Sequence, residues 1–168
     1  NDTPFGAMRF AAESEARALP RMASIQNAYN LVNRTFEDGG LEEACVREEV
    51  SLLAYSPLGQ GYLTGKYRNG ARPPKSRKVL FERLQRYETP QGLRAIESYL
   101  TLADQHGIDP AKLAIKFCDT RPFMGSTIIG ATTMAQLETC IDAFELTWTN
   151  ELEDAVNALH VDQPSPCP

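Results

Sequence analysis

Three short apolar segments separated by long helical stretches constrain the fold of this chain more than any other feature. The segments span residues 22–26, 50–55 and 126–129. The second is almost uniformly apolar, which is typical of strands buried on both faces of a parallel sheet that helices cover. Alternating strands and helices favour right-handed crossovers and a parallel sheet. Three strands are too few to close a barrel, which needs eight. The sequence therefore predicts an α/β fold that is incomplete as a closed structure.

Capping residues and hydrophobic spacing predict where the helices lie. Asp2 or Thr3 followed by Pro4 is a strong helix start, because proline has no N–H to leave unbonded there. Asp109 before Pro110 repeats this pattern, and Thr133 with Gln136 forms a capping box. The predicted helices span residues 4–19, 41–48, 78–87, 91–106, 110–118, 133–144 and 150–160. The proline-rich segment 162–168 is expected to be a loose tail.

Composition excludes several classes of function. The net charge of −5 argues against nucleic acid as a partner, since phosphate binding needs a basic face. No apolar run approaches the ~18 residues that span a membrane. The four cysteines have no spacing typical of a zinc site or a disulfide framework. They predict free thiols in a reducing, cytoplasmic setting, without a bound metal.

One stretch departs from the acidic character of the chain. Residues 66–86 hold eight basic side chains and one acidic side chain, Glu82. A solvated loop is one interpretation. A flap that covers an anionic cofactor is another, because cationic side chains complement phosphates. Nucleic-acid binding is less favoured, since no aromatic side chains interleave with the charges as a stacking platform requires.

Ligands of α/β folds gather at the carboxyl ends of the strands, where three polar or glycine-rich segments of this chain lie. Gln26 offers an amide that donates and accepts, and Tyr55 offers a flat ring for stacking. Gly59 and Gly61 let the backbone approach a ligand closely. Residues 130–133 precede a helix, whose free N–H groups favour an anion. This combination suits a dinucleotide, although Tyr55 could be simple packing and Gln26 a satisfied core amide.

No generic nucleotide motif is present. Residues 61–66 do not have the spacing of a P-loop, and no glycine-rich dinucleotide fingerprint follows a strand. Three longer segments, however, resemble the aldo-keto reductases, in particular the bacterial group related to potassium-channel β subunits. Residues 24–30 resemble the sixth strand of that family, 54–67 the seventh strand and its loop, and 126–137 the eighth strand and its cofactor helix.

The resemblance implies a partial (β/α)8 TIM barrel, with residues 1–168 forming a single C-terminal half-barrel domain that holds strands 6–8 and their helices. It also implies binding of NADP(H) by an oxidoreductase that converts carbonyls to alcohols. By position, Asn1 and Gln26 would hold the nicotinamide carboxamide, and Tyr55 would stack on the ring. The pyrophosphate would be lined by Ser56, Leu58 and Gly59. The adenosine 2′-phosphate end would meet Gly130, Thr132 and Gln136. Cys140 departs from the asparagine that is common in the family, and it is expected to be a packed residue.

The resemblance further implies that the catalytic Tyr, Lys, Asp and His of the family, which come from its first four strands, are absent from this chain. We therefore assign no catalytic residue. The alternative hypothesis is a non-catalytic half-barrel that binds nucleotide or assembles with itself. An uncovered inner face, including Leu52, Ala54 and Ile128, is expected to drive association. The expected partners are a nicotinamide nucleotide and either a second copy of the chain or a missing N-terminal half.

Overall fold

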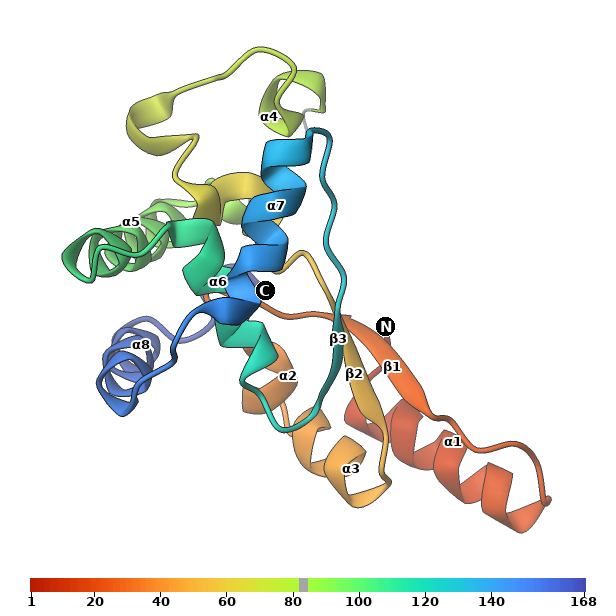
Figure 1. Ribbon diagram of the computed structural model, residues 1–168. Helices are drawn as coiled ribbons and strands as arrows, with labels where there is room; N and C mark the ends of the chain where they lie inside the picture. The colour runs from red at the N-terminus through yellow and green to blue at the C-terminus, as the bar shows by residue number, and fades with distance from the viewer. Residues whose placement is uncertain (82–84) are drawn as a thin grey trace.

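A three-stranded parallel sheet forms the centre of the protein. In the computed structural model, which describes residues 1–81 and 85–168, the strands are ordered β1-β2-β3. Helices connect the strands, and α5, α6, α7 and α8 lie to one side of the sheet (left in Figure 1). The α/β class, the number of strands and their parallel pairing are confirmed.

The elements follow one another along the chain with long connections after β2. In order they are α1 (Pro4–Ala16), β1 (Ser24–Ala28), α2 (Thr35–Asp38), α3 (Leu41–Arg47), β2 (Ser51–Tyr55), η1 (Gly59–Thr64), η2 (Arg68–Gly70), α4 (Arg77–Leu80), η3 (Gln85–Tyr87), α5 (Pro90–Gln105), α6 (Pro110–Asp119), β3 (Met124–Thr127), α7 (Met134–Asp142), η4 (Ala143–Glu145) and α8 (Asn150–Asp162), where η marks a 3₁₀ helix. None of these helices is long and apolar enough to cross a membrane.

The third strand begins and ends two residues earlier than predicted. Leu52 pairs with Met124 but Leu53 pairs with Ser126, so Gly125 is an extra residue in the ladder. A side chain at Gly125 would lie 2.6 Å from the Cβ of Ser51, which explains a glycine at this irregularity. One ladder bond continues past the strand, from the N–H of Ile128 to the carbonyl of Ala54 at 2.8 Å.

The two faces of the sheet differ in what covers them. Ile25, Leu52 and Ala54 are buried on the face that packs against the helices. Alternation along the strands places Gln26 and Tyr55 on the other face, which we call the uncovered face. Gln26 and its neighbours Ser24 and Ser51 are exposed there. Leu52 and Ala54 were expected on an open apolar face, and this is wrong for both, whereas Ile128 is exposed as expected.

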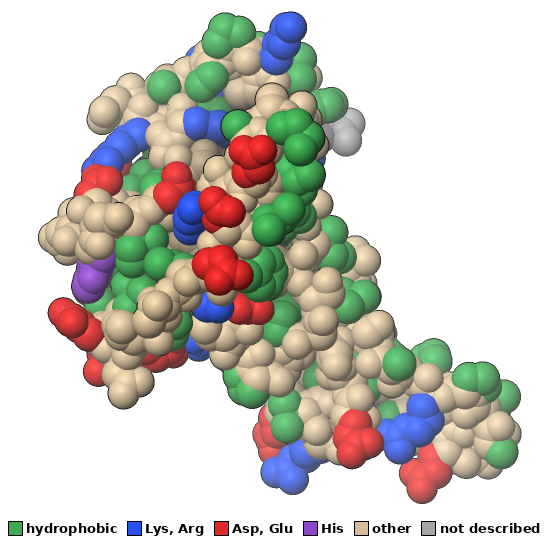
Figure 2. Space-filling view, in the orientation of Figure 1, with side chains coloured by type: hydrophobic (Ala, Val, Ile, Leu, Met, Phe, Trp, Pro, Cys, Tyr) green, Lys and Arg blue, Asp and Glu red, His purple; other side chains and the backbone are tan. Residues whose placement is uncertain are grey.

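Most of the exposed large apolar side chains lie on helices. Phe5, Met8 and Phe10 of α1 are exposed, and so are Met134 and Ile141 of α7. Figure 2 shows hydrophobic side chains gathered along α7 and on the arm at the lower right, where Figure 1 places α1. Exposed apolar surface of this kind is thus present, but it flanks the sheet rather than covering it.

Phe117 is the centre of a cluster that joins α6, α8 and the loop after β1. Its fully buried ring stacks on Tyr29 with centroids 5.5 Å apart. The guanidinium carbons of Arg34 and Arg121 lie 5.3 and 4.7 Å from its centroid, one of the recognised cation–π geometries. Glu153 pairs with Arg121 and Glu37 pairs with Arg34, so each cation over the ring is held by a carboxylate.

This ion pair predicts an acid-sensitive part of the stability. The Arg121 guanidinium lowers the pKa of Glu153 from 4.5 to about 2, and the indole of Trp148 also donates to it. Because the folded pKa is the lower one, the stabilisation is present above pH 4.5 and is lost as pH falls toward 2. Glu153→Gln should lower the free energy of unfolding by about 2 kcal/mol at pH 7. Urea unfolding at pH 7 and pH 3 measures this, and a difference from wild type that does not shrink at pH 3 would contradict it.

The helix starts are mostly where the capping residues predict them. The hydroxyls of Thr3 and Thr133 accept from N–H groups of the first turns of α1 and α7, and Asp109 caps α6. Thr149 rather than Asn150 caps α8. The helix predicted over 78–87 is shorter, because α4 ends at Leu80; residues 82–84 lie outside the described residues.

The C-terminal segment 162–168 is not loose as expected. Cys167 is fully buried, and its N–H donates to the carbonyl of Val32 at 3.0 Å. The hydroxyl of Ser165 accepts from the N–H of Arg34 and donates to Asp38. The tail supplies hydrogen-bonding groups that the loop after β1 uses, which a composition argument cannot detect.

Candidate functional site

The amino terminus lies at the carboxyl edge of the sheet, beside the end of β2. The Asn1 side chain donates from Nδ2 to the Tyr55 hydroxyl at 2.8 Å. The Asp2 backbone is held by the Asn27 side chain through two contacts of 3.3 Å. The structure therefore brings together two residues, Asn1 and Tyr55, that are 54 positions apart and were both expected to contact nicotinamide.

Gln26 shares the uncovered face with Tyr55. Gln26 pairs with Leu53, and Ala28, the last residue of β1, pairs with Tyr55. Gln26 therefore lies on the same face as Tyr55, two residues before the end of β1. Its side chain is exposed, which rules out the alternative of a satisfied core amide. Tyr55 is half-buried, and its hydroxyl accepts from Asn1. An amide and an aromatic ring thus face the same open space.

The loop after β2 turns sharply at Ser56. Ser56 has a φ of +56°, which non-glycine residues rarely adopt, and its carbonyl accepts from the N–H of Gly59 at 2.9 Å. Gly59 has a φ of +53°, and a side chain there would lie 3.3 Å from the ring of Tyr87. The loop is therefore compact, and Ser56 and Leu58 are only half-buried while Gly59 is buried.

The space beside Gly61 is not open to a ligand as expected. A side chain at Gly61 would lie 2.5 Å from Cε of Lys66, so the space beside Gly61 is filled by the chain itself. Gly59 and Gly61 permit positive φ and close internal packing. Gly130 differs from both, because nothing lies within 4 Å of the position of its missing side chain.

The loop after β3 forms the start of α7. The Gln136 side chain turns back, so that its Oε1 accepts from the N–H of Thr132 at 2.9 Å and from the hydroxyl of Thr132 at 3.1 Å. Thr133 caps the helix by accepting from the N–H of Gln136. Gly130, Thr132 and Gln136 are all exposed. The segment presents a capped helix start with an open approach, a suitable place for an anion.

Leu58 joins the two loops. It packs against the small buried cluster of Ile115, Cys140 and Ala143, and Ile129 packs against the same cluster. The loop after β2 is thereby fixed beside α7 and beside the segment that leads into it. Cys140 is 3% exposed, which confirms the expectation that it is a packed residue.

The basic stretch 66–86 is only partly available for a ligand. Arg68 pairs with Glu97 and Asp104 of α5, and Lys78 pairs with Glu88. Tyr62 donates to the same Glu88 and, as the largest cause, lowers the pKa of that carboxyl. Arg83 and Glu82 lie outside the described residues. Within the described part of the chain, Lys66, Arg72, Lys75 and Arg77 form no ion pair with a carboxylate, so these cations can still complement an anion.

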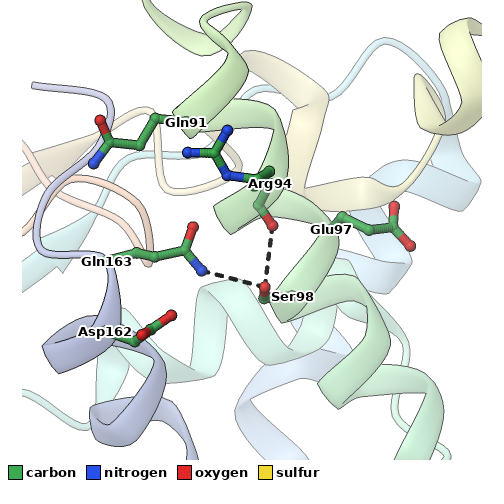
Figure 3. A pocket seen from close by; sticks show the side chains of 6 residues that line it. All are labelled: Gln91, Arg94, Glu97, Ser98, Asp162 and Gln163. Carbon is green, nitrogen blue, oxygen red and sulfur yellow. Dashed lines mark hydrogen bonds between the residues drawn. The ribbon is translucent and has the colours of Figure 1, made fainter.

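A separate depression lies between α5 and the end of α8 (Figure 3). It is lined by Gln91, Arg94, Glu97, Ser98, Asp162 and Gln163. In Figure 3 Gln163 donates to Ser98, whose hydroxyl donates to the carbonyl of Arg94. None of the residues expected from the sequence lies there. Over residues 1–81 and 85–168, no group of three His, Cys, Asp or Glu side chains is placed to hold a metal ion.

Two residues of the site were missed by reasoning from the sequence. Asn27 anchors Asp2 and so places Asn1, and Asn30 donates to the carbonyl of Ser56 at 3.0 Å. Both belong to the segment 24–30, which resembles the sixth strand of the aldo-keto reductases. The sequence feature that could have identified them is an amide side chain on each side of the end of β1, because amides that become buried there need hydrogen-bond partners.

The chain is similar in sequence to known proteins over nearly its whole length. The profile of the Aldo/keto reductase family matches residues 7–160. Protein tas of Escherichia coli K12 is 45% identical over 168 residues, which is all of this chain and 48% of that protein. An aldo-keto reductase of Babesia bovis is 34% identical over 95% of this chain and 59% of its own length.

A third relative comes from another group. A probable voltage-gated potassium channel subunit beta of Arabidopsis thaliana is 32% identical over 72% of this chain and 38% of its own length. The chain therefore spans about half the length of the curated relatives that it matches.

Proposed function

This chain belongs to the aldo/keto reductase family, which includes the group related to potassium-channel β subunits. We propose that it is the NADP(H)-binding portion of an oxidoreductase that converts carbonyls to alcohols. Residues 1–168 form, in this proposal, a C-terminal half-barrel that corresponds to strands 6–8 of an eight-stranded barrel. β1, β2 and β3 take the places of those strands.

The convergence of two loops at the carboxyl edge of the sheet carries the proposal. Leu58, of the loop after β2, and Ile129, of the loop before α7, pack against the same buried cluster, and the N–H of Ile128 bonds to the carbonyl of Ala54, the residue before Tyr55. Ligands of parallel α/β sheets bind at this edge. The exposed amide of Gln26, the ring of Tyr55 and the open helix start at Gly130 are spread along it, as the parts of a dinucleotide require.

The residues present fit a nicotinamide dinucleotide at both ends. Asn1 and Gln26 offer amides for a carboxamide, and the Tyr55 ring offers a stacking surface. Ser56, Leu58 and Gly59 would follow the pyrophosphate, and Gly130, Thr132 and Gln136 would meet the adenosine phosphate. When bound, the reduced cofactor supplies a hydride. The residues of this chain bind and orient it; none of them is assigned as the acid that protonates the carbonyl.

Two measurements on the purified chain test this function. NADPH fluorescence should change on adding protein, because the stacked and partly desolvated nicotinamide has a different environment from water. Aldehyde reduction by the chain alone should be slower by a factor of ~10²–10⁴ or more than by a complete enzyme, since no positioned acid is present. If NADPH fluorescence is unchanged up to millimolar nucleotide, the proposed function falls.

The second candidate function is a non-catalytic module that assembles with itself or with a missing half. The exposed apolar side chains of α1 favour it, since Phe5 is 76% exposed and Phe10 51%. Sedimentation velocity across a concentration series should then show dimers or larger species, and Phe5→Ser with Phe10→Ser should shift the population to monomer. A monomer at all concentrations would remove self-assembly, whereas nucleotide binding without any reduction would favour a binding module.

A further inference from the structure

Asn30 is a buried polar residue between the two strands that carry the proposed nicotinamide site. Its side chain is inaccessible to solvent, with 0% of the residue exposed. Nδ2 donates to the carbonyl of Ser56 at 3.0 Å, and Oδ1 accepts from the N–H of Val32 at 3.0 Å. A buried amide that is engaged at both ends fixes the separation of the two segments it joins.

The turn at Ser56 depends on such a support. A non-glycine residue at a φ of +56° costs ~1 kcal/mol or more, and it persists only where its surroundings hold it. The Ser56 carbonyl receives two donors, Asn30 from the loop after β1 and Gly59 from its own loop. The bond from Gly59 is part of the turn itself, so Asn30 supplies the hydrogen bond that ties the Ser56 carbonyl to another part of the chain.

The other side of Asn30 is fixed as well. Its backbone N–H donates to the carbonyl of Asn33, and the N–H of Asn33 donates back, both at 3.0 Å. Val32, which donates to the Asn30 side chain, accepts at its carbonyl from the N–H of Cys167 in the C-terminal tail. The hydrogen bonds therefore run from the tail through Val32 and Asn30 to Ser56.

We propose that Asn30 is a positioning residue, which sets the course of the loop 56–61 for the nucleotide by donating to the Ser56 carbonyl. It is inaccessible to a ligand, so it acts through the groups that its side chain bonds, chiefly the Ser56 carbonyl and also Tyr87. The consequence for affinity rests on the proposed function of this site, whereas the consequence for the conformation of the loop does not.

Asn30→Asp and Asn30→Leu separate positioning from bulk packing. A carboxylate at this position accepts from Val32 but cannot donate to Ser56, whereas its protonated form can. Burial raises the pKa of such a carboxyl. With NADP⁺ as the probe, Asn30→Asp should bind about tenfold more weakly than wild type at pH 8, and the ratio should approach one at pH 5. Asn30→Leu should bind about tenfold more weakly at both pH values. Asn30→Leu gains no titratable group, so its loss of affinity relative to wild type has no reason to change on acidification.

Tyr29→Phe is the matched control. It removes a hydroxyl that donates to Glu37 from the residue next to Asn30, in the same buried loop, and it leaves the Ser56 contacts intact. Its NADP⁺ affinity should stay within about twofold of wild type. A loss in this control equal to that of Asn30→Leu would overturn the proposal, because any damage to this loop would then have the same effect.

Hydrogen exchange of peptides covering residues 56–65, measured without nucleotide, tests the positioning role independently of nucleotide binding. The N–H groups of Gly59 and Gly61 should exchange about tenfold faster in Asn30→Leu than in wild type and Tyr29→Phe. Faster exchange in a protein that binds no NADP⁺ would support the positioning role while removing the proposed function. Unchanged exchange in Asn30→Leu, or unchanged affinity where wild type binds, would overturn the positioning role.

Discussion

Replacing Tyr55 with alanine should raise the dissociation constant for NADPH about 30-fold. Stacking of a base on an aromatic side chain contributes ~1–3 kcal/mol, and a 30-fold change corresponds to about 2 kcal/mol. The ring lies at the end of β2 on the uncovered face, and its hydroxyl anchors Asn1 at 2.8 Å. Alanine removes both the stacking surface and the anchor of a second proposed ligand residue. Fluorescence titration of NADPH measures the change.

Tyr55→Phe is the control that separates these two contributions. It retains the ring and loses only the hydrogen bond from Asn1, so the dissociation constant should rise no more than about threefold, since one exposed hydrogen bond contributes ~0.5 kcal/mol. Thermal unfolding of both variants should remain close to that of wild type, because Tyr55 is only half-buried. Equal NADPH affinity of Tyr55→Ala and wild type would remove Tyr55 from the site.

Replacing Phe117 with alanine should lower the free energy of unfolding by about 3–5 kcal/mol. The ring is fully buried, stacks on Tyr29, and lies between the guanidinium groups of Arg34 and Arg121. Its loss leaves a cavity and takes away the aromatic face from two cations that are largely withdrawn from water. Urea unfolding monitored by the fluorescence of Trp148, whose ring centroid is 6.3 Å away, reports on this region.

Two variants serve as comparisons for this prediction. Phe117→Leu keeps most of the volume but no aromatic face, so it should cost about 1–2 kcal/mol. Phe5→Ala removes the same ring at a position that is 76% exposed, and it should change stability by less than ~0.5 kcal/mol. A Phe117→Ala protein as stable as Phe5→Ala would show that the cluster around Phe117 does not hold α6 and α8 to the sheet.

The parts of the fold that could be predicted depend on local interactions. The caps at Thr3, Asp109 and Thr133 are bonds between neighbours in the chain, and strand positions follow from short apolar runs. The parts that could not be predicted depend on contacts between distant residues. The irregular pairing of β3 with β2 places Gly125 against Ser51, and the packed tail depends on Val32, 135 positions before Cys167.

The candidate site divides in the same way. Gln26, Tyr55 and the loop starting at Gly130 could be selected because strand ends are where such folds bind ligands. The expectation for Gly61 was wrong, since a glycine in a loop does not reveal whether the space beside it belongs to a ligand or to Lys66. The hydrogen bond from Asn30 to the Ser56 carbonyl joins the loops after β1 and β2, and no local sequence pattern predicts it.

The central claim is that this chain binds a nicotinamide dinucleotide along the carboxyl edge of its sheet. Hydrogen exchange of the whole chain, with and without saturating NADP⁺, tests this most directly. We predict slower exchange in residues 55–61 and 130–137, and unchanged exchange in 91–98, which line the depression between α5 and α8. Slower exchange confined to residues 91–98 and 162–163, or no change at any position, would contradict the claim.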